Sequence, residues 1–244
     1  MTFDVILLSS LIVIVAFLVR GLTGFGSGPI MVSFLLLFLD MKLVAPTAAI
    51  LAVLTGFLLV STFQTRKWIR YDILRIIVPA YMVGIIVGTY VLVFLKSGLV
   101  KTLFGLFITA YALKILFEDK KKEEAKEIRN YLGVISGFFG GITGGLFSSG
   151  GPPVVLYLTR KIGDKAVLRA TLVFFFLLMD SWRLVLFGYA GLINGDILKF
   201  SLYLLPAFLI GNLAGSLLHI RINQALFTKI VALVLLIIGL ILLF

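Results

Sequence analysis

The chain has 244 residues, of which 61% are apolar and 14% charged, and its mean hydropathy is +1.18. A soluble domain is nearer half apolar and a quarter charged, so this composition cannot cover a core with polar surface and excludes a soluble protein. A net charge of +11 would favour nucleic acid as the partner of a soluble chain. In a membrane protein the same charge belongs to cytoplasmic loops, so we expect an all-α polytopic membrane protein with the lipid bilayer as partner and no nucleic acid.

The first apolar stretch, residues 3–19, is just long enough to cross the bilayer, because a span needs about 20 residues. Arg20 ends it, and the glycine-rich run Gly21-Leu-Thr-Gly-Phe-Gly-Ser-Gly-Pro29 follows. The next apolar piece, residues 30–39, is too short to span. Since glycine and proline weaken a helix interior, we expect a hairpin of broken helices that meets other protein inside the membrane. Three full spans follow, at residues 43–63, 71–95 and 98–117.

The second half has the same order after a basic linker at residues 118–130. Short apolar pieces at residues 131–143 and 152–158 flank the run Gly144-Gly-Leu-Phe-Ser-Ser-Gly-Gly-Pro152, which predicts a second broken hairpin. Three more spans complete the chain, at residues 166–187, 197–218 and 222–244. We therefore divide the chain into a first transmembrane repeat (1–117), a cytoplasmic linker (118–130) and a second transmembrane repeat (131–244).

Matching motifs indicate that the two halves are copies of one unit. Gly21-Leu-Thr-Gly24 matches Gly141-Ile-Thr-Gly144 at an offset of 120, and Gly28-Pro29 matches Gly151-Pro152 at an offset of 123. The pattern Pro-x4-Gly-x3-Gly also occurs once in each half, with its glycines at positions 84 and 88 and at positions 211 and 215. We expect these Gly-x3-Gly pairs to serve close helix packing.

Positive charge orients the two copies. The lysines of residues 118–130 place this linker in the cytoplasm. Counting spans from the linker, the basic loops at residues 66–70 and 160–165 also fall inside, and both chain ends fall outside. The first copy then begins outside and the second inside, so the repeats are inverted. The expected location is the plasma membrane, with several passes and both termini extracytoplasmic.

Inverted repeats with discontinuous helices are typical of secondary transporters, which bind substrate near the bilayer midplane. A half-helix that begins there presents unpaired N–H groups and the positive end of its dipole to an anion. Arg20 stands beside the first run as a cation with no evident partner; snorkelling to the outer headgroups is its alternative role. Packing alone is the alternative for the two glycine runs. The predicted substrate site comprises Arg20, Gly21, Thr23, Gly24, Gly26, Ser27, Gly28, Thr143, Gly144, Ser148, Ser149, Gly150 and Gly151.

Asp180 and Arg183 form the other charged group inside a predicted span. Their i, i+3 spacing on one helix allows them to neutralise each other. A structural pair and a coupling or gating role are both open, with a proton or sodium ion as the candidate coupling ion. The sequence does not fix the oligomeric state.

Enzyme chemistry has little support in this composition. One histidine and no cysteine leave neither a metal cluster nor a histidine-based catalytic triad, and the chain has no Walker pattern. We expect no enzymatic activity, no cofactor and no bound metal.

The first glycine run, together with Gly137-Phe-Phe-Gly-Gly-Ile-Thr-Gly-Gly145 and Gly150-Gly-Pro-Pro153 after the basic linker, resembles the sulfite exporter TauE/SafE family. The resemblance implies a plasma-membrane carrier of small sulfur-containing anions, such as sulfite or organosulfonates, driven by an ion gradient. It does not carry over a particular substrate. A passive anion channel and a non-transporting membrane scaffold are the alternatives.

Overall fold

The computed structural model describes residues 2–23, 26–62, 68–117, 129–217 and 224–243, which form ten α-helices and no strand. The all-α prediction is therefore confirmed. The helices of the first half are α1 (Phe3–Thr23), α2 (Ser27–Leu35), α3 (Met41–Thr62), α4 (Tyr71–Phe94) and α5 (Ser97–Phe117). Those of the second half are α6 (Asn130–Phe147), α7 (Gly151–Lys161), α8 (Lys165–Tyr189), α9 (Gly195–Leu217) and α10 (Gln224–Ile241).

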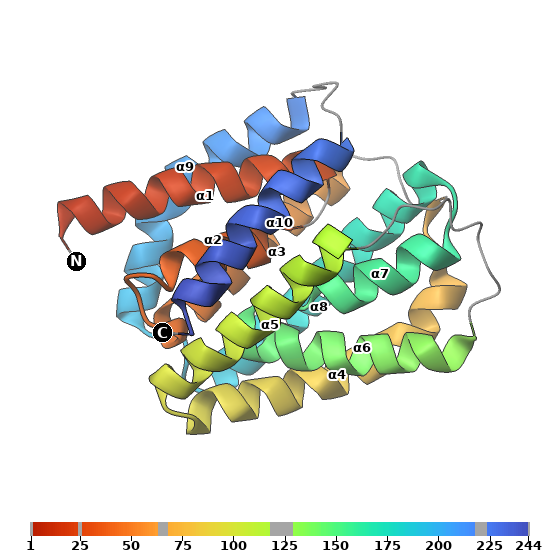
Figure 1. Ribbon diagram of the computed structural model, residues 1–244, viewed down its shortest axis with the longest axis horizontal. Coiled ribbons are helices and arrows are strands. Elements are labelled where there is room, and N and C mark those ends of the chain that lie inside the picture. Colours follow the sequence, from red (N-terminus) through yellow and green to blue (C-terminus); the bar gives the residue numbers. More distant parts are fainter. Residues whose placement is uncertain (1, 24–25, 63–67, 118–128, 218–223, 244) are drawn as a thin grey trace.

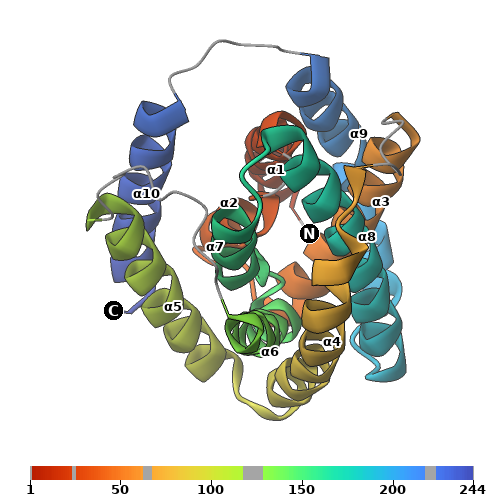
Figure 2. The same cartoon turned by 90° about the vertical axis from the view of Figure 1, so that its right-hand side faces the viewer.

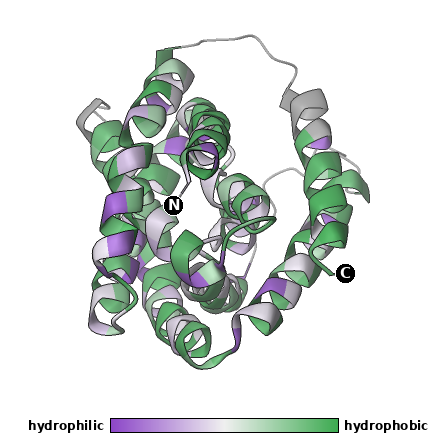
Figure 3. Ribbon diagram, turned by 90° about the vertical axis from the view of Figure 1, so that its left-hand side faces the viewer, coloured by the Kyte–Doolittle hydropathy of each residue, from purple (hydrophilic) through white to green (hydrophobic). Residues whose placement is uncertain are grey.

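Six segments of the described helices are long and apolar enough to cross a bilayer: Phe3–Leu22, Met41–Val60, Tyr71–Phe94, Ser97–Phe117, Ala166–Tyr189 and Gly195–Leu217. Five of them match spans predicted as full length, and the first extends the marginal stretch 3–19. The predicted span 222–244 overlaps α10, whose described part includes the shorter apolar segment Val231–Ile241. Apolar residues dominate the helices (Figure 3), and large apolar side chains such as Phe57, Tyr90 and Leu202 are exposed, as a lipid-facing surface requires. The chain is a multi-pass membrane protein.

Both helix breaks are shorter than the sequence predicts. α1 continues through Arg20 and Gly21 to Thr23, and α6 continues through Gly144 to Phe147. The short helix α2 ends at Leu35 rather than at position 39. A helical glycine costs about 1 kcal/mol relative to alanine, yet here the missing side chain allows two helices to touch. A Cβ atom on Gly141, for example, would lie 2.2 Å from the carbonyl oxygen of Tyr81 on α4.

The Gly-x3-Gly pairs make the same kind of contact, so the packing prediction for them is confirmed. A Cβ atom on Gly84 or Gly88 of α4 would lie 2.2 Å from a carbonyl oxygen of α6. On Gly211 and Gly215 of α9, it would lie 2.4 and 2.2 Å from carbonyl oxygens of α1. Any larger side chain at these positions would force the paired helices apart.

The helices pair across the two halves of the chain. α1 packs along α9, and α6 packs along α4. α3 packs against α8, and α5 against α10. When each helix is replaced by the helix at the same place in the other half (α1 by α6, and so on), the α1–α9 pair becomes the α6–α4 pair. The α3–α8 and α5–α10 pairs are unchanged. The start of α1 and the end of α10 lie toward the same end of the molecule (Figure 1).

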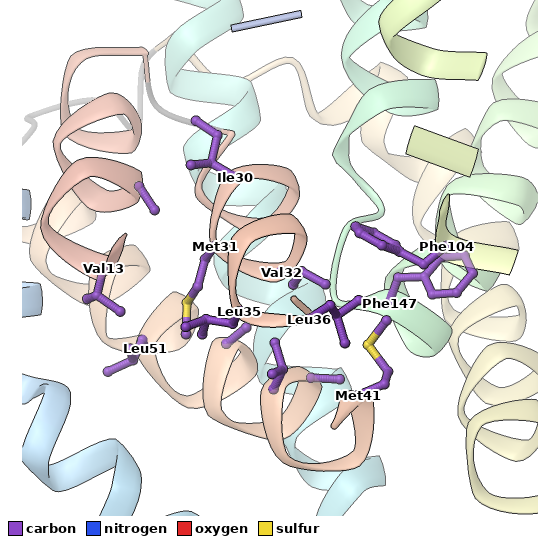
Figure 4. Close-up of a cluster of buried hydrophobic side chains, with 14 of the residues drawn as sticks. Val13, Ile30, Met31, Val32, Leu35, Leu36, Met41, Leu51, Phe104 and Phe147 are labelled. Atoms are coloured by element: carbon purple, nitrogen blue, oxygen red, sulfur yellow. The ribbon is translucent and has the colours of Figure 1, made fainter. Parts of the chain in front are cut away.

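The short helices α2 and α7 lie in the middle of the bundle when it is viewed end-on (Figure 2). In the side view α2 lies toward the left and α7 toward the right (Figure 1). The side chains of Met31, Val32 and Leu35 in α2, and of Leu36 directly after it, are buried among other apolar side chains (Figure 4). Most residues of α2 are apolar and buried, which holds the helix in the protein interior and positions its first residues there.

Candidate functional site

The two helix breaks touch each other. A Cβ atom on Gly28, in the first turn of α2, would lie 2.5 Å from the carbonyl oxygen of Ser148 at the end of α6. Ser148 has a φ of 52°, in the left-handed region, and its hydroxyl donates a hydrogen bond of 2.7 Å to the carbonyl oxygen of Ala45. Gly26, which precedes α2, has a φ of 98°, a value that glycine adopts without strain. The break of the first half is therefore in direct contact with the break of the second half.

A cavity of about 40 Å³ lies where the breaks meet. By the same measure one water molecule needs about 10–15 Å³, so the cavity has room for a small ion or a few waters. Both halves contribute to its wall. The lining residues are Phe17, Arg20, Gly26, Ser27, Gly28, Pro29, Met31, Ala48, Ala52, Tyr81, Ser148, Ser149, Gly150, Gly151, Phe176, Asp180 and Arg183.

Two arginines and one aspartate supply the charge of this cavity. Arg20 of α1 donates from Nη2 to Oδ2 of Asp180 at 3.2 Å, and Arg183 donates from Nη2 to Oδ1 at 2.9 Å. All three side chains are at least 90% buried. The carboxylate therefore lies between two guanidinium groups, and the three charges together leave a formal charge of +1. A buried net charge without a counter-ion is costly, so this arrangement favours the entry of an anion.

Further polar contacts fix the two arginines while leaving donors unused. Nη1 of Arg20 donates to the Ser27 hydroxyl at 3.2 Å, and its Nη2 also donates to the Ala52 carbonyl at 3.3 Å. Nη1 of Arg183 donates to the Gly144 carbonyl at 3.4 Å, at the end of α6. The buried Nε atoms of both arginines have no hydrogen-bond partner, nor does the buried hydroxyl of Ser149. Buried donors without a partner on residues of a cavity wall are available to donate hydrogen bonds to the oxygens of an oxyanion.

Ten of the predicted site residues lie together in the wall of this cavity: Arg20, Gly26, Ser27, Gly28, Ser148, Ser149, Gly150, Gly151, Asp180 and Arg183. Three lie elsewhere. Gly21 packs on α9, where a Cβ atom would lie 2.8 Å from the Asn212 carbonyl oxygen. The Thr143 hydroxyl donates to carbonyl oxygens of its own helix. Gly144 lies just behind the wall and accepts the hydrogen bond from Arg183.

Two further predicted residues fall on the gap between α1 and α2. Gly24 lies outside the described residues. Thr23 ends α1, and its side chain is also outside what the structure describes. Their predicted roles stay predictions.

The expectation that Arg20 lacks a partner is wrong. Its guanidinium pairs with Asp180, which lies 160 positions further along the chain. A buried cation needs a counter-charge, and the fold supplies one from the opposite half. Asp180 and Arg183 do pair with each other, as their spacing predicted, but the pair belongs to a group of three.

The helix starts contribute less positive charge than a dipole argument alone suggests. Proline lacks an N–H group, and Pro29, Pro152 and Pro153 occupy the first turns of α2 and α7. Each start also follows closely on the negative C-terminal end of the preceding helix, which offsets its dipole. The arginines are therefore the main source of positive charge in this cavity.

A comparison with protein families identifies the family of this chain. The model of the sulfite exporter TauE/SafE family matches residues 9–242. The chain belongs to this family. Searches of curated proteins and of solved structures found no match. The match confirms the family assignment made from the glycine runs, and TauE/SafE proteins are membrane transporters.

Several cavity residues of this TauE/SafE protein were not predicted from the sequence: Phe17, Pro29, Met31, Ala48, Ala52, Tyr81 and Phe176. One signal was available for two of them. Ala52 and Phe176 are 124 positions apart, close to the offsets of 120 and 123 between the matching glycine motifs, and both line the cavity. Tyr81 gave no such signal. It lies in α4 against the second hairpin, where a Cβ atom on Gly150 would lie 2.0 Å from its hydroxyl oxygen.

Proposed function

We propose that this protein is a secondary transporter that binds a small anion in the cavity between the two helix breaks. The substrate is a sulfur-containing anion, such as sulfite or an organosulfonate, in keeping with the TauE/SafE family. The observation that carries the proposal is the buried Arg20–Asp180–Arg183 group with its formal charge of +1 and unused donors. Planar guanidinium groups suit the oxygens of such anions.

Alternating access between the two sides of the membrane is the proposed mechanism. The order of the glycine motifs supports two inverted repeats, as does the exchange of α1–α9 with α6–α4. The anion would then lie at the interface of the repeats, with Arg20 from the first and Arg183 from the second. Transporters of this architecture move such a site between the two sides by rocking or gating. We place the protein in the plasma membrane with both termini outside, and we propose a proton or sodium gradient as its driving force.

The test is transport of radiolabelled sulfite into proteoliposomes by the wild type and by Arg20→Met. This substitution leaves Asp180 and Arg183 as a neutral pair, so the folded protein is retained while the site loses its excess positive charge. We expect uptake to fall at least tenfold. Arg75→Met is the matched control, because Arg75 is an exposed arginine of α4 outside the cavity wall, and it should transport normally.

The same preparation separates the alternative functions. A carrier shows counterflow, in which unlabelled sulfite on one side accelerates uptake of label from the other, and its rate saturates. A passive channel shows neither. A scaffold shows no transport and no thermal stabilisation by sulfite. Unchanged uptake by Arg20→Met would refute the assigned site.

A further inference from the structure

The formal charge of the cavity determines which ligand charge it binds most favourably. Four of the described residues in its wall have ionisable side chains: Arg20, Tyr81, Asp180 and Arg183. A tyrosine hydroxyl is neutral near pH 7, so the two arginines and the aspartate determine the formal charge. Asp180 uses both carboxylate oxygens, one for each guanidinium, which is the geometry of an ionised carboxylate between two cations.

The backbone does not alter this balance. The positive ends of α2 and α7 lie at the cavity, but the negative ends of α1 and α6 adjoin the same breaks. Helix dipoles of opposite sign at one place cancel to a large degree. The formal charge of +1 is therefore the charge that an entering ligand meets.

We propose that Asp180 sets the cavity charge at +1 and thereby selects singly charged anions over doubly charged ones. This inference rests on the proposed anion site, and among the proposed substrates it favours the singly charged hydrogensulfite and organosulfonates over the doubly charged sulfite ion. A single negative charge neutralises the cavity, whereas a dianion leaves an excess negative charge buried away from water. Uncompensated buried charge is strongly unfavourable, so the two complexes differ in stability. A neutral loaded site is also the least costly one to move within a low-dielectric interior.

Both carboxylate oxygens of Asp180 pair with the arginines, so Asp180 acts on the ligand through the net charge of the cavity. It is thus a specificity-determining residue with a defined signature, because its removal changes which ligand is preferred. Replacing Asp180 with asparagine keeps the shape of the side chain and raises the cavity charge to +2. The dianion then becomes the ligand that neutralises the site.

The experiment measures the affinity of purified protein for methanesulfonate and for sulfate by isothermal titration calorimetry at pH 8. These two tetrahedral ions are similar in size and fully ionised there, and they differ by one charge. We expect the wild type to bind methanesulfonate at least tenfold more tightly than sulfate. In Asp180→Asn the order should reverse, with sulfate bound at least tenfold more tightly.

A second pair of variants leaves the three charged residues in place, in case Asp180→Asn does not fold. Ser27→Asp adds a carboxylate beside Nη1 of Arg20, which the Ser27 hydroxyl contacts at 3.2 Å. The cavity charge then falls to zero, and binding of both ions should be lost. Ser27→Asn adds nearly the same volume without charge, so any binding that remains should still favour methanesulfonate.

The outcomes separate this inference from the proposed function. Wild-type protein that binds both ions equally, or sulfate more tightly, would refute the role of Asp180 while the anion site stands. An unchanged order of preference in Asp180→Asn would refute it as well. Binding of neither ion to the wild type, with no thermal stabilisation by sulfite, would overturn the anion site and the inference together.

Discussion

The close contact between Gly150 and Tyr81 predicts that alanine destabilises the protein at position 150 but not at the neighbouring position 151. In Gly150→Ala the new methyl carbon would lie 2.0 Å from the Tyr81 hydroxyl, 2.2 Å from the Gly140 carbonyl oxygen and 2.8 Å from the Gly144 Cα atom. Two of these atoms are backbone, so a change of rotamer cannot remove the clash. The backbone φ of Gly150 is −83°, which alanine tolerates, so the effect is steric and not conformational.

The expected cost is at the upper end of what overpacking causes, about 3 kcal/mol, because the α6–α7 hairpin must open to admit the methyl group. In a chain of this size 1 kcal/mol corresponds to about 2–4 °C in Tm, so the melting temperature should fall by about 6–12 °C. Gly151→Ala is the matched control. Its methyl group would meet only the ring of Phe176, at 3.4 Å, which is ordinary contact.

Thermal unfolding of the purified variants in detergent measures both effects. Adding Tyr81→Phe to Gly150→Ala removes the nearest atom but not the Gly140 carbonyl, so we expect a partial recovery of Tm. If Gly150→Ala and Gly151→Ala melt at the same temperature, the packing of Gly150 against α4 and α6 described above is wrong.

Two further substitutions test the helix contacts and the buried charges. Gly88→Ala places a methyl group 2.2 Å from a carbonyl oxygen of α6 and should lower Tm by several degrees, whereas Gly98→Ala, with no atom within 4 Å, should leave Tm unchanged; equal melting would argue against the α4–α6 contact. Asp180→Asn removes the carboxylate between two buried arginines and should cost about 3–5 kcal/mol in anion-free buffer. Sulfate should restore part of that loss in a thermal-shift assay, and the absence of any recovery would show that the arginines do not hold an anion.

Much of the fold follows from properties that can be read locally. Span lengths follow from hydropathy, because about 20 apolar residues are needed wherever a helix crosses lipid. The two breaks follow from glycine and proline, which occur together at Gly28-Pro29 and Gly151-Pro152. Local composition could not show where each break begins. Gly141 and Gly144 are helical because α4 packs against them, and that contact joins distant parts of the chain.

The candidate site was predictable to the extent that it coincides with the helix breaks. Ser27, Ser149 and Gly150 belong to the glycine runs and do line the cavity. The partner of Arg20 could not be found in this way, since Asp180 is 160 positions away and its visible partner in the sequence is Arg183, three positions on. Tyr81 was not predicted because nothing in the sequence distinguishes it from other residues of an apolar helix. Only the packing of α4 against α6 brings it to the cavity.

The pairing of α1 with α9 and of α4 with α6 bears on how this protein could change shape. Each pair joins one helix from either copy, and their backbones approach so closely at glycine that they cannot slide freely past one another. The two halves of the chain are therefore intertwined and do not form separable bodies. If the transport cycle that we propose moves rigid units within the membrane, each unit must therefore combine helices from both halves of the chain.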